Sequence, residues 1–176
     1  MAHSIELLLD DRADAAVREL WRALDEAGLP SQQRVRSDTN RPHITLIAAE
    51  RISPDVDTGL AELDDLFPLP TTLGAPVVFF GGGRLTLARL VIPSEAVLAL
   101  HRRIYELCQP YVWNLFSHSA PGHWTPPHVT LGRRLTPAQI GEALARAGGI
   151  SSDIEAGIVG LRRWDSDART EHVLIS

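Results

Sequence analysis

The chain contains no lysine, because all 17 of its basic residues are arginines. This absence excludes several kinds of site. A phosphate-binding P-loop needs a lysine, a pyridoxal enzyme holds its cofactor through a lysine Schiff base, and a ligase that carries a nucleotide on lysine needs that amine. The net charge of −5 also disfavours binding along an extended nucleic-acid duplex, which relies on many cationic contacts. A small or terminal phosphate remains compatible with this composition.

Cysteine and long apolar runs are also scarce. The single cysteine, Cys108, cannot form an internal disulfide and lies in the pattern VLALHRRIYELC, which is typical of a buried helix face in a reduced compartment. No stretch approaches the roughly 20 apolar residues of a membrane span. The start MAHSIELLLDDRAD lacks the basic region and extended apolar core of an export signal. We therefore expect a cytoplasmic protein with no membrane partner.

The chain does contain an internal repeat. PHITL at 42–46 recurs as PHVTL at 127–131, at an offset of 85 residues in a chain of 176. We predict a single bilobed domain over 1–176, formed by an internal duplication with approximate repeats 1–83 and 84–176.

Both halves are expected to contain the same order of elements: strand, helix, motif strand, helix and further strands. Ser53-Pro54 and Thr136-Pro137 each place a hydroxyl at a helix N-cap and a proline at the first helical position. Helices are expected at 16–24, 54–66, 96–104 and 137–147, with a stop at Gly148-Gly149. Strands are expected at 4–10, 42–46, 75–81, 84–92, 127–131, 153–164 and 171–176. The run Gly81-Gly82-Gly83 favours a hairpin turn, because a phosphate-binding glycine loop would join a strand to a helix.

The two motifs place the same polar pair on one face of a strand. Side chains two residues apart in a strand point to the same side, so His43 is a neighbour of Thr45 and His128 of Thr130. The aliphatic residues between and after them face the other way and anchor each strand in the core. An approximate two-fold axis would bring both pairs to one cleft between the lobes.

Two imidazoles around one small space supply an acid and a base. Because histidine ordinarily titrates near pH 6.5, one ring can be neutral while the other is protonated, as in-line displacement at phosphorus requires. For one His-x-Thr alone, a strand histidine satisfied by a neighbour is the commoner interpretation. Two copies, each preceded by proline and followed by an aliphatic residue, favour a shared catalytic site.

With these motifs, the chain resembles the two-histidine (2H) phosphoesterase superfamily, in its bacterial 2′-5′ RNA ligase-like, RNA 2′,3′-cyclic phosphodiesterase branch. The resemblance covers nearly the whole chain. It implies an α+β fold with two pseudo-symmetric lobes of mainly antiparallel sheet, helices outside and an active-site cleft between them. It also implies metal-independent catalysis without a cofactor, by His43, Thr45, His128 and Thr130.

The resemblance further suggests a polarity and a phosphate ligand. In such enzymes the first-motif histidine is usually the acid on the leaving 3′-oxygen, and the second is the base on water. Arg133, five residues after His128, looks like the arginine often found beyond the second motif, where it could clamp a phosphate. The first copy, HITLIA, has no counterpart, so the clamp is single or comes from elsewhere.

Two loops before the motif strands offer further substrate contacts. The first loop contains Arg34, Arg36 and Arg41, which could contact phosphates, and the second contains Trp113, Phe116 and Trp124, which could stack on a base. Solvated loop arginines and a small aromatic core are the alternatives. We select Arg41, Trp124 and Arg133 as substrate-binding candidates.

The remaining histidines are assigned no chemistry. His118, His123 and His128 recur every five residues, but a loop rich in glycine and proline does not define a metal geometry, so no metal site is expected. His101 lies on the apolar face of a helix, where a structural role is expected.

The expected function is therefore a phosphodiesterase that opens 2′,3′-cyclic phosphates of RNA ends or nucleotides, with 2′-5′ linkage cleavage or ligation as related chemistry. The expected partner is a small nucleotide or an RNA 3′-end phosphate, bound by a monomer. The rival interpretations are a module that binds a nucleotide without turnover and a metal hydrolase that uses the loop histidines.

Overall fold

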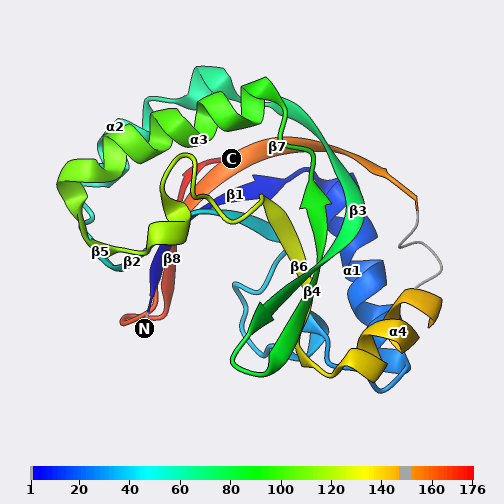
Figure 1. Ribbon diagram of the computed structural model, residues 1–176. Coiled ribbons are helices and arrows are strands. Elements are labelled where there is room, and N and C mark those ends of the chain that lie inside the picture. Colours follow the sequence, from blue (N-terminus) through cyan, green and yellow to red (C-terminus); the bar gives the residue numbers. More distant parts are fainter. Residues whose placement is uncertain (1, 147–151) are drawn as a thin grey trace.

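The computed structural model describes residues 2–146 and 152–176, which form an arched antiparallel sheet flanked by helices (Figure 1). The strands are β1 (His3–Leu9), β2 (His43–Ile52), β3 (Leu69–Gly81), β4 (Arg84–Val91), β5 (Val112–Leu115), β6 (His128–Leu135), β7 (Ile154–Asp165) and β8 (Thr170–Ile175). The α-helices are α1 (Asp11–Glu26), α2 (Val56–Ala61), α3 (Glu95–Cys108) and α4 (Pro137–Arg146). Short 3₁₀ turns lie at Gln32–Arg34, Asp64–Leu66, Gln109–Tyr111 and Ser117–Ser119.

The strand order is symmetric about the centre of the sheet. The order is β5-β2-β1-β7-β3-β4-β6, with β8 paired to β7. If β5 is set aside, exchanging β1 with β4, β2 with β6 and β3 with β7 gives the same strand order, read from the opposite edge of the sheet. A two-fold repeat of one five-element unit would produce this arrangement. The duplication stays a prediction, and the strand order is compatible with it.

The sheet curves until its two motif strands approach each other. Four strands separate β2 from β6 in the sheet order, and yet β2 and β6 are in contact. The curvature arises along β3 and β7, which pair only over Leu69–Leu73 and Ile154–Ile158 before turning to other partners. The ends of the strands that carry the two histidines therefore lie near one another.

The helices of the two halves are exchanged. Helix α1 follows β1 but packs against β6 and α4, whereas α3 follows β4 but packs against β2 and α2. Figure 1 shows α2 with α3 over one end of the arch and α1 with α4 at the other. Trp21 of α1 donates its indole N–H to the carbonyl of Thr130 at 2.9 Å. Each motif strand is thus covered by a helix from the other half of the sequence.

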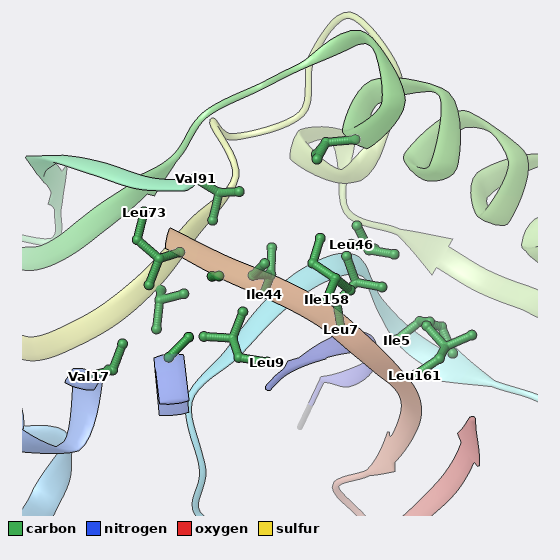
Figure 2. Packing of buried hydrophobic residues seen from close by; sticks show 14 of the residues in the cluster. Ile5, Leu7, Leu9, Val17, Ile44, Leu46, Leu73, Val91, Ile158 and Leu161 are labelled. Atoms are coloured by element: carbon green, nitrogen blue, oxygen red, sulfur yellow. The ribbon is translucent and has the colours of Figure 1, made fainter. Parts of the chain in front are cut away.

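The aliphatic residues of both motifs lie in one continuous core, as the sequence predicted. Ile44, Leu46, Val129 and Leu131 are fully buried. Figure 2 shows Ile44 and Leu46 beside Leu7 and Ile158 within this cluster. Burial of such a side chain contributes about 1.5–3 kcal/mol, so the motif strands are held firmly by their apolar faces.

Most predicted helices and strands are present, but several differ in their bounds; α1 begins at Asp11 and β2 continues to Ile52. The helix expected over 54–66 shortens to α2 and a separate 3₁₀ turn. The strand expected over 75–81 starts earlier, at Leu69, because its first residues pair with β7 before the rest pair with β4. The short edge strand β5 was not predicted. The expected helix stop at Gly148-Gly149 lies outside the described residues.

Two further sequence predictions hold. Gly82 and Gly83 form the β3–β4 hairpin turn with φ of +56° and +75°, a backbone conformation that favours glycine. Cys108 is buried at the end of α3, and burial raises the pKa of its thiol to about 12. In the described ranges, every helix is too short or too polar to cross a bilayer.

Candidate active site

A cleft of about 440 Å³ brings the two motifs together. Its lining includes His43, Thr45, Trp124, His128 and Arg133, five of the seven candidate residues. Pockets of this volume accommodate small organic ligands. The other two candidates, Thr130 and Arg41, are not among the lining residues.

The two imidazoles are held in the same way. Nδ1 of His43 lies 2.8 Å from the carbonyl oxygen of Arg41, and Nδ1 of His128 lies 2.8 Å from that of Pro126. A carbonyl oxygen can only accept, so Nδ1 carries a hydrogen in both rings. Nε2 is therefore the atom at which each ring can take up or release a proton. In each case the acceptor lies two residues before the histidine, where the chain enters the motif strand.

The surroundings of the two rings differ. Nε2 of His43 lies 3.7 Å from Oε1 of Glu6, whereas the ring of His128 packs on Phe79 with centroids 4.5 Å apart. Burial lowers the pKa of His128 below 6.5, and the charges of Arg133, His43 and His118 lower it further, while the hydrogen bond to Pro126 opposes the shift. The neutral form of His128 is therefore favoured near pH 7.

Glu6 lies on the floor of the cleft and was missed by the sequence analysis. It is 5% exposed and is paired with Arg162, which is 4% exposed. Burial on its own would raise the pKa of Glu6, but His43, Arg162 and the hydroxyl of Ser4 together lower it below the usual 4.5. The available signal was a lone acidic residue within the apolar strand SIELLLD.

The two motif threonines occupy different positions. Thr45 is half-buried and lines the cleft. Thr130 is 7% exposed, and its backbone carbonyl accepts from Trp21 of α1. The strand alternation predicted both hydroxyls on the cleft face, but the two threonines are unequally accessible.

Trp124 is fixed between the halves of the chain. Its ring stacks on His101 of α3, with centroids 3.9 Å apart and planes 10° from parallel, and its Nε1 donates to the carbonyl of Thr45 at 3.3 Å. His101 is 2% exposed and lies 3.0 Å from the carbonyl oxygen of Ser119. His101 therefore positions an aromatic wall of the cleft, in agreement with the structural role expected for it.

The other aromatic and histidine candidates are divided between the cleft and the surface. Phe116 and His118 also line the cleft. Trp113 is 50% exposed and lies under Arg51, outside the cleft. His123 is exposed and is not a lining residue.

The two candidate arginines lie in different places. Arg133 is exposed at the cleft, and the equivalent position of the first motif, Ala48, also lines it without a charge. The side chain of Arg41 lines a separate hollow of about 300 Å³ together with Asp14 and Arg18. Arg41 contributes its carbonyl to the site, as the acceptor for His43.

One group in the described part of the chain has the spacing of a metal site, and it lies elsewhere. His3, Asp165 and Asp167 converge where the β7–β8 turn meets β1. Nε2 of His3 lies 3.1 Å from Asp167 and 3.5 Å from Asp165, and Oδ1 of Asp165 accepts two backbone N–H groups of the turn. The hydrogen bond between His3 and Asp167 ties the turn to the sheet. His118, His123 and His128 do not form such a group.

The fold matches several solved structures along nearly its full length. The structure of Kluyveromyces marxianus Usb1 with uridine monophosphate matches with a TM-score of 0.56 and 12% identity, over 99% of this chain and 97% of that one. Escherichia coli LigT complexed with 3′-AMP matches with a TM-score of 0.51 and 13% identity, over 99% and 93%. A structure described as a phosphoesterase matches with a TM-score of 0.51 and 17% identity, over 99% and 94%. At these identities the likeness shows the fold.

No curated protein sequence matches the chain. The model of the 2′-5′ RNA ligase superfamily, however, matches residues 9–168, a span that contains both His-x-Thr motifs and Arg133. With the symmetric sheet and the cleft that its curvature creates, this match places the chain in the 2′-5′ RNA ligase superfamily.

Proposed function

We propose that the protein is a metal-independent phosphodiesterase that hydrolyses 2′,3′-cyclic phosphates of nucleotides or RNA ends. The observation that carries this proposal is the matched pair of imidazoles in one cleft, each with Nδ1 on a carbonyl and Nε2 available for proton transfer. A binding module has no use for two titrating rings held in this way. No cofactor is required for the chemistry.

In the proposed reaction, His128 is the base and His43 the acid. Nε2 of His128 takes a proton from water, and the water oxygen attacks phosphorus. The bond from phosphorus to the 3′-oxygen breaks, and His43 delivers the proton on its Nε2 to that oxygen. The product carries a 2′-phosphate, and Arg133 is placed to bind the non-bridging oxygens. The same steps with a 5′-hydroxyl in place of water would form a 2′-5′ linkage, and their reverse would cleave one.

The comparisons support a small nucleotide as the ligand. The Usb1 and LigT structures were solved with uridine monophosphate and 3′-AMP, respectively. The cleft volume suits one nucleotide, and a single exposed arginine at its edge suits one phosphate. This supports a terminal or mononucleotide phosphate over an extended duplex.

A panel of 2′,3′-cyclic mononucleotides, 2′-5′ dinucleotides and cyclic-phosphate-ended oligoribonucleotides tests the proposal. We expect hydrolysis of the cyclic substrates to 2′-phosphates, resolved from 3′-phosphates by chromatography, with unchanged rates after exhaustive chelation. Saturable binding with no product from any substrate would favour the binding module. Loss of activity on chelation and recovery with a divalent cation would favour the metal hydrolase.

The pH dependence of kcat should show an acid limb with a midpoint below 6.5. The base must be neutral, so the rate falls as pH decreases through the pKa of His128, which burial and nearby cations lower. At higher pH the rate should fall again as the acid loses its proton, which gives a bell-shaped profile. Initial rates measured between about pH 4 and 9 check both limbs. A flat profile, or an acid limb centred above 6.5, contradicts this assignment.

A further inference from the structure

The carboxylate of Glu6 is buried beside the reacting nitrogen of His43. Oε1 accepts from the Ser4 hydroxyl at 2.6 Å and lies 3.7 Å from Nε2 of His43. Oε2 accepts from Nε and Nη2 of Arg162 at 2.8 and 2.7 Å. A buried carboxylate is tolerated only when charges and hydrogen bonds satisfy it, and this one has a partner at each oxygen.

Glu6 shares its guanidinium partner with a second carboxylate, that of Glu171. Arg162 is shared, because its Nη1 also donates to Glu171 at 2.6 Å. One guanidinium thus faces two carboxylates, which leaves a net charge of −1 in the group. Nε2 of His43, directed at Glu6, is the titratable atom that can supply the missing positive charge. His128, Arg133 and His118 also line the cleft, and the charges of Arg133, His43 and His118 lower the pKa of His128.

Only one half of the fold contains this carboxylate. In the sheet register Glu6 is opposite Thr45 on one side and Arg162 on the other. The corresponding position beside the second motif is Ala88, which is opposite Thr130 and Val77. An ion pair on one side of the symmetric sheet is thus matched by two apolar residues on the other. This sequence difference gives the two histidines different electrostatic surroundings.

We propose that Glu6 is a positioning residue that holds a proton on Nε2 of His43, and that Arg162 keeps Glu6 in place and ionised for this purpose. The inference rests on the proposed function, because it explains which ring acts as the acid. Arg162 has a second contact that serves the same end: its Nη1 donates at 2.9 Å to the carbonyl of Thr39, in the segment that leads into His43. Arg162 therefore holds both the carboxylate of Glu6 and the segment that leads into His43.

Glu6→Gln tests the proposal, because it removes the charge and nearly preserves the shape. We expect kcat on a 2′,3′-cyclic nucleotide to fall by about 10- to 100-fold, part of the 10²–10⁴ that general acid catalysis supplies. The alkaline limb of the pH profile should move down by about one unit or more, with the acid limb unchanged. A substrate whose leaving group needs no proton should react at nearly the wild-type rate. Loss of activity on both substrates, with unmoved limbs, would mean a purely structural role and would overturn the proposal.

Glu171→Gln is the matched control. It removes the same unit charge from the other partner of Arg162, without touching the carboxylate beside His43. We expect the acid limb to stay in place and the alkaline limb to move much less than in Glu6→Gln, because Glu171 is linked to His43 only through Arg162 and Glu6. If Glu171→Gln moves the alkaline limb as far as Glu6→Gln does, the effect belongs to the general field of the cluster, and the assignment to Glu6 is wrong.

A spectroscopic measurement separates this inference from the proposed function and does not depend on the variant folding. Ring ¹⁵N shifts of the wild-type protein at pH 7 should show His43 as an imidazolium and His128 as a neutral ring with its hydrogen on Nδ1. Two neutral rings, or the reverse assignment, would overturn the role of Glu6 even in an active enzyme. If the expected shifts appear but His43→Ala still hydrolyses cyclic phosphates at the wild-type rate, the proposed function fails and the Glu6–His43 pairing stands.

Discussion

Replacement of His43 or His128 by alanine should lower kcat for a 2′,3′-cyclic nucleotide by about 10²–10⁴-fold in each case, the contribution of a positioned general acid or base. Each variant loses the motif histidine whose Nε2 is proposed to transfer the proton. Both rings are partly exposed at the cleft and lie outside the aliphatic core, so the fold should survive. Steady-state kinetics with circular dichroism checks both statements.

His172→Ala is the control for this pair. His172 is exposed on β8 and is absent from the cleft lining, so its replacement should leave kcat unchanged. The double variant of His43 and His128 should be little worse than the poorer single variant, because acid and base act in one concerted displacement. Rates near wild type for both single variants would end the two-histidine mechanism.

A substrate with a good leaving group should distinguish the two histidines. 4-Nitrophenolate departs without protonation, so a nucleoside 4-nitrophenyl phosphodiester removes the need for an acid but not for a base. We expect His43→Ala to recover most of its lost rate on this substrate, and His128→Ala to recover none. The release of nitrophenolate gives the rate directly.

The physical reason for this asymmetry lies in the surroundings of the rings. His128 is buried against Phe79 and faces cations, so its neutral form is favoured, whereas His43 faces the carboxylate of Glu6. Wild-type enzyme measured on both substrates gives the reference ratio. Rescue of His128→Ala alone would reverse the assigned polarity, and rescue of neither would contradict the role of His43 as the acid.

Local patterns were sufficient to predict the motif strands and most of the helices. The two predicted helix starts at Ser53-Pro54 and Thr136-Pro137 show where such local patterns fail. Thr136 forms a reciprocal cap with Gln139 three residues later, and α4 starts at Pro137 as predicted. Ser53 has Val56 at the equivalent position and bonds instead to Asp55, so α2 begins late and stays short.

Features that depend on distant pairing could not be predicted from one sequence. Glu6 and Arg162 are 156 residues apart, and their contact depends on the register between β1 and β7. Arg41 precedes the first residue of β2, so strand alternation does not determine where its side chain points. The burial of Thr130 and the contact of its carbonyl with Trp21 of α1 depend on tertiary packing, which no periodicity within the motif reveals.

The exchange of helices between the halves also determines when the cleft can exist during synthesis. The first motif strand emerges from the ribosome long before α3, the helix that covers it, and α1 emerges long before β6, the strand on which it packs. Neither half can bury its own motif, and the contacts that complete both are far apart in sequence. The loop-closure entropy of such non-local contacts opposes early folding, so we expect slow folding in one late step. We therefore expect a nascent chain to have no partial active site, because the proposed acid, the proposed base and Glu6 come together in the same step.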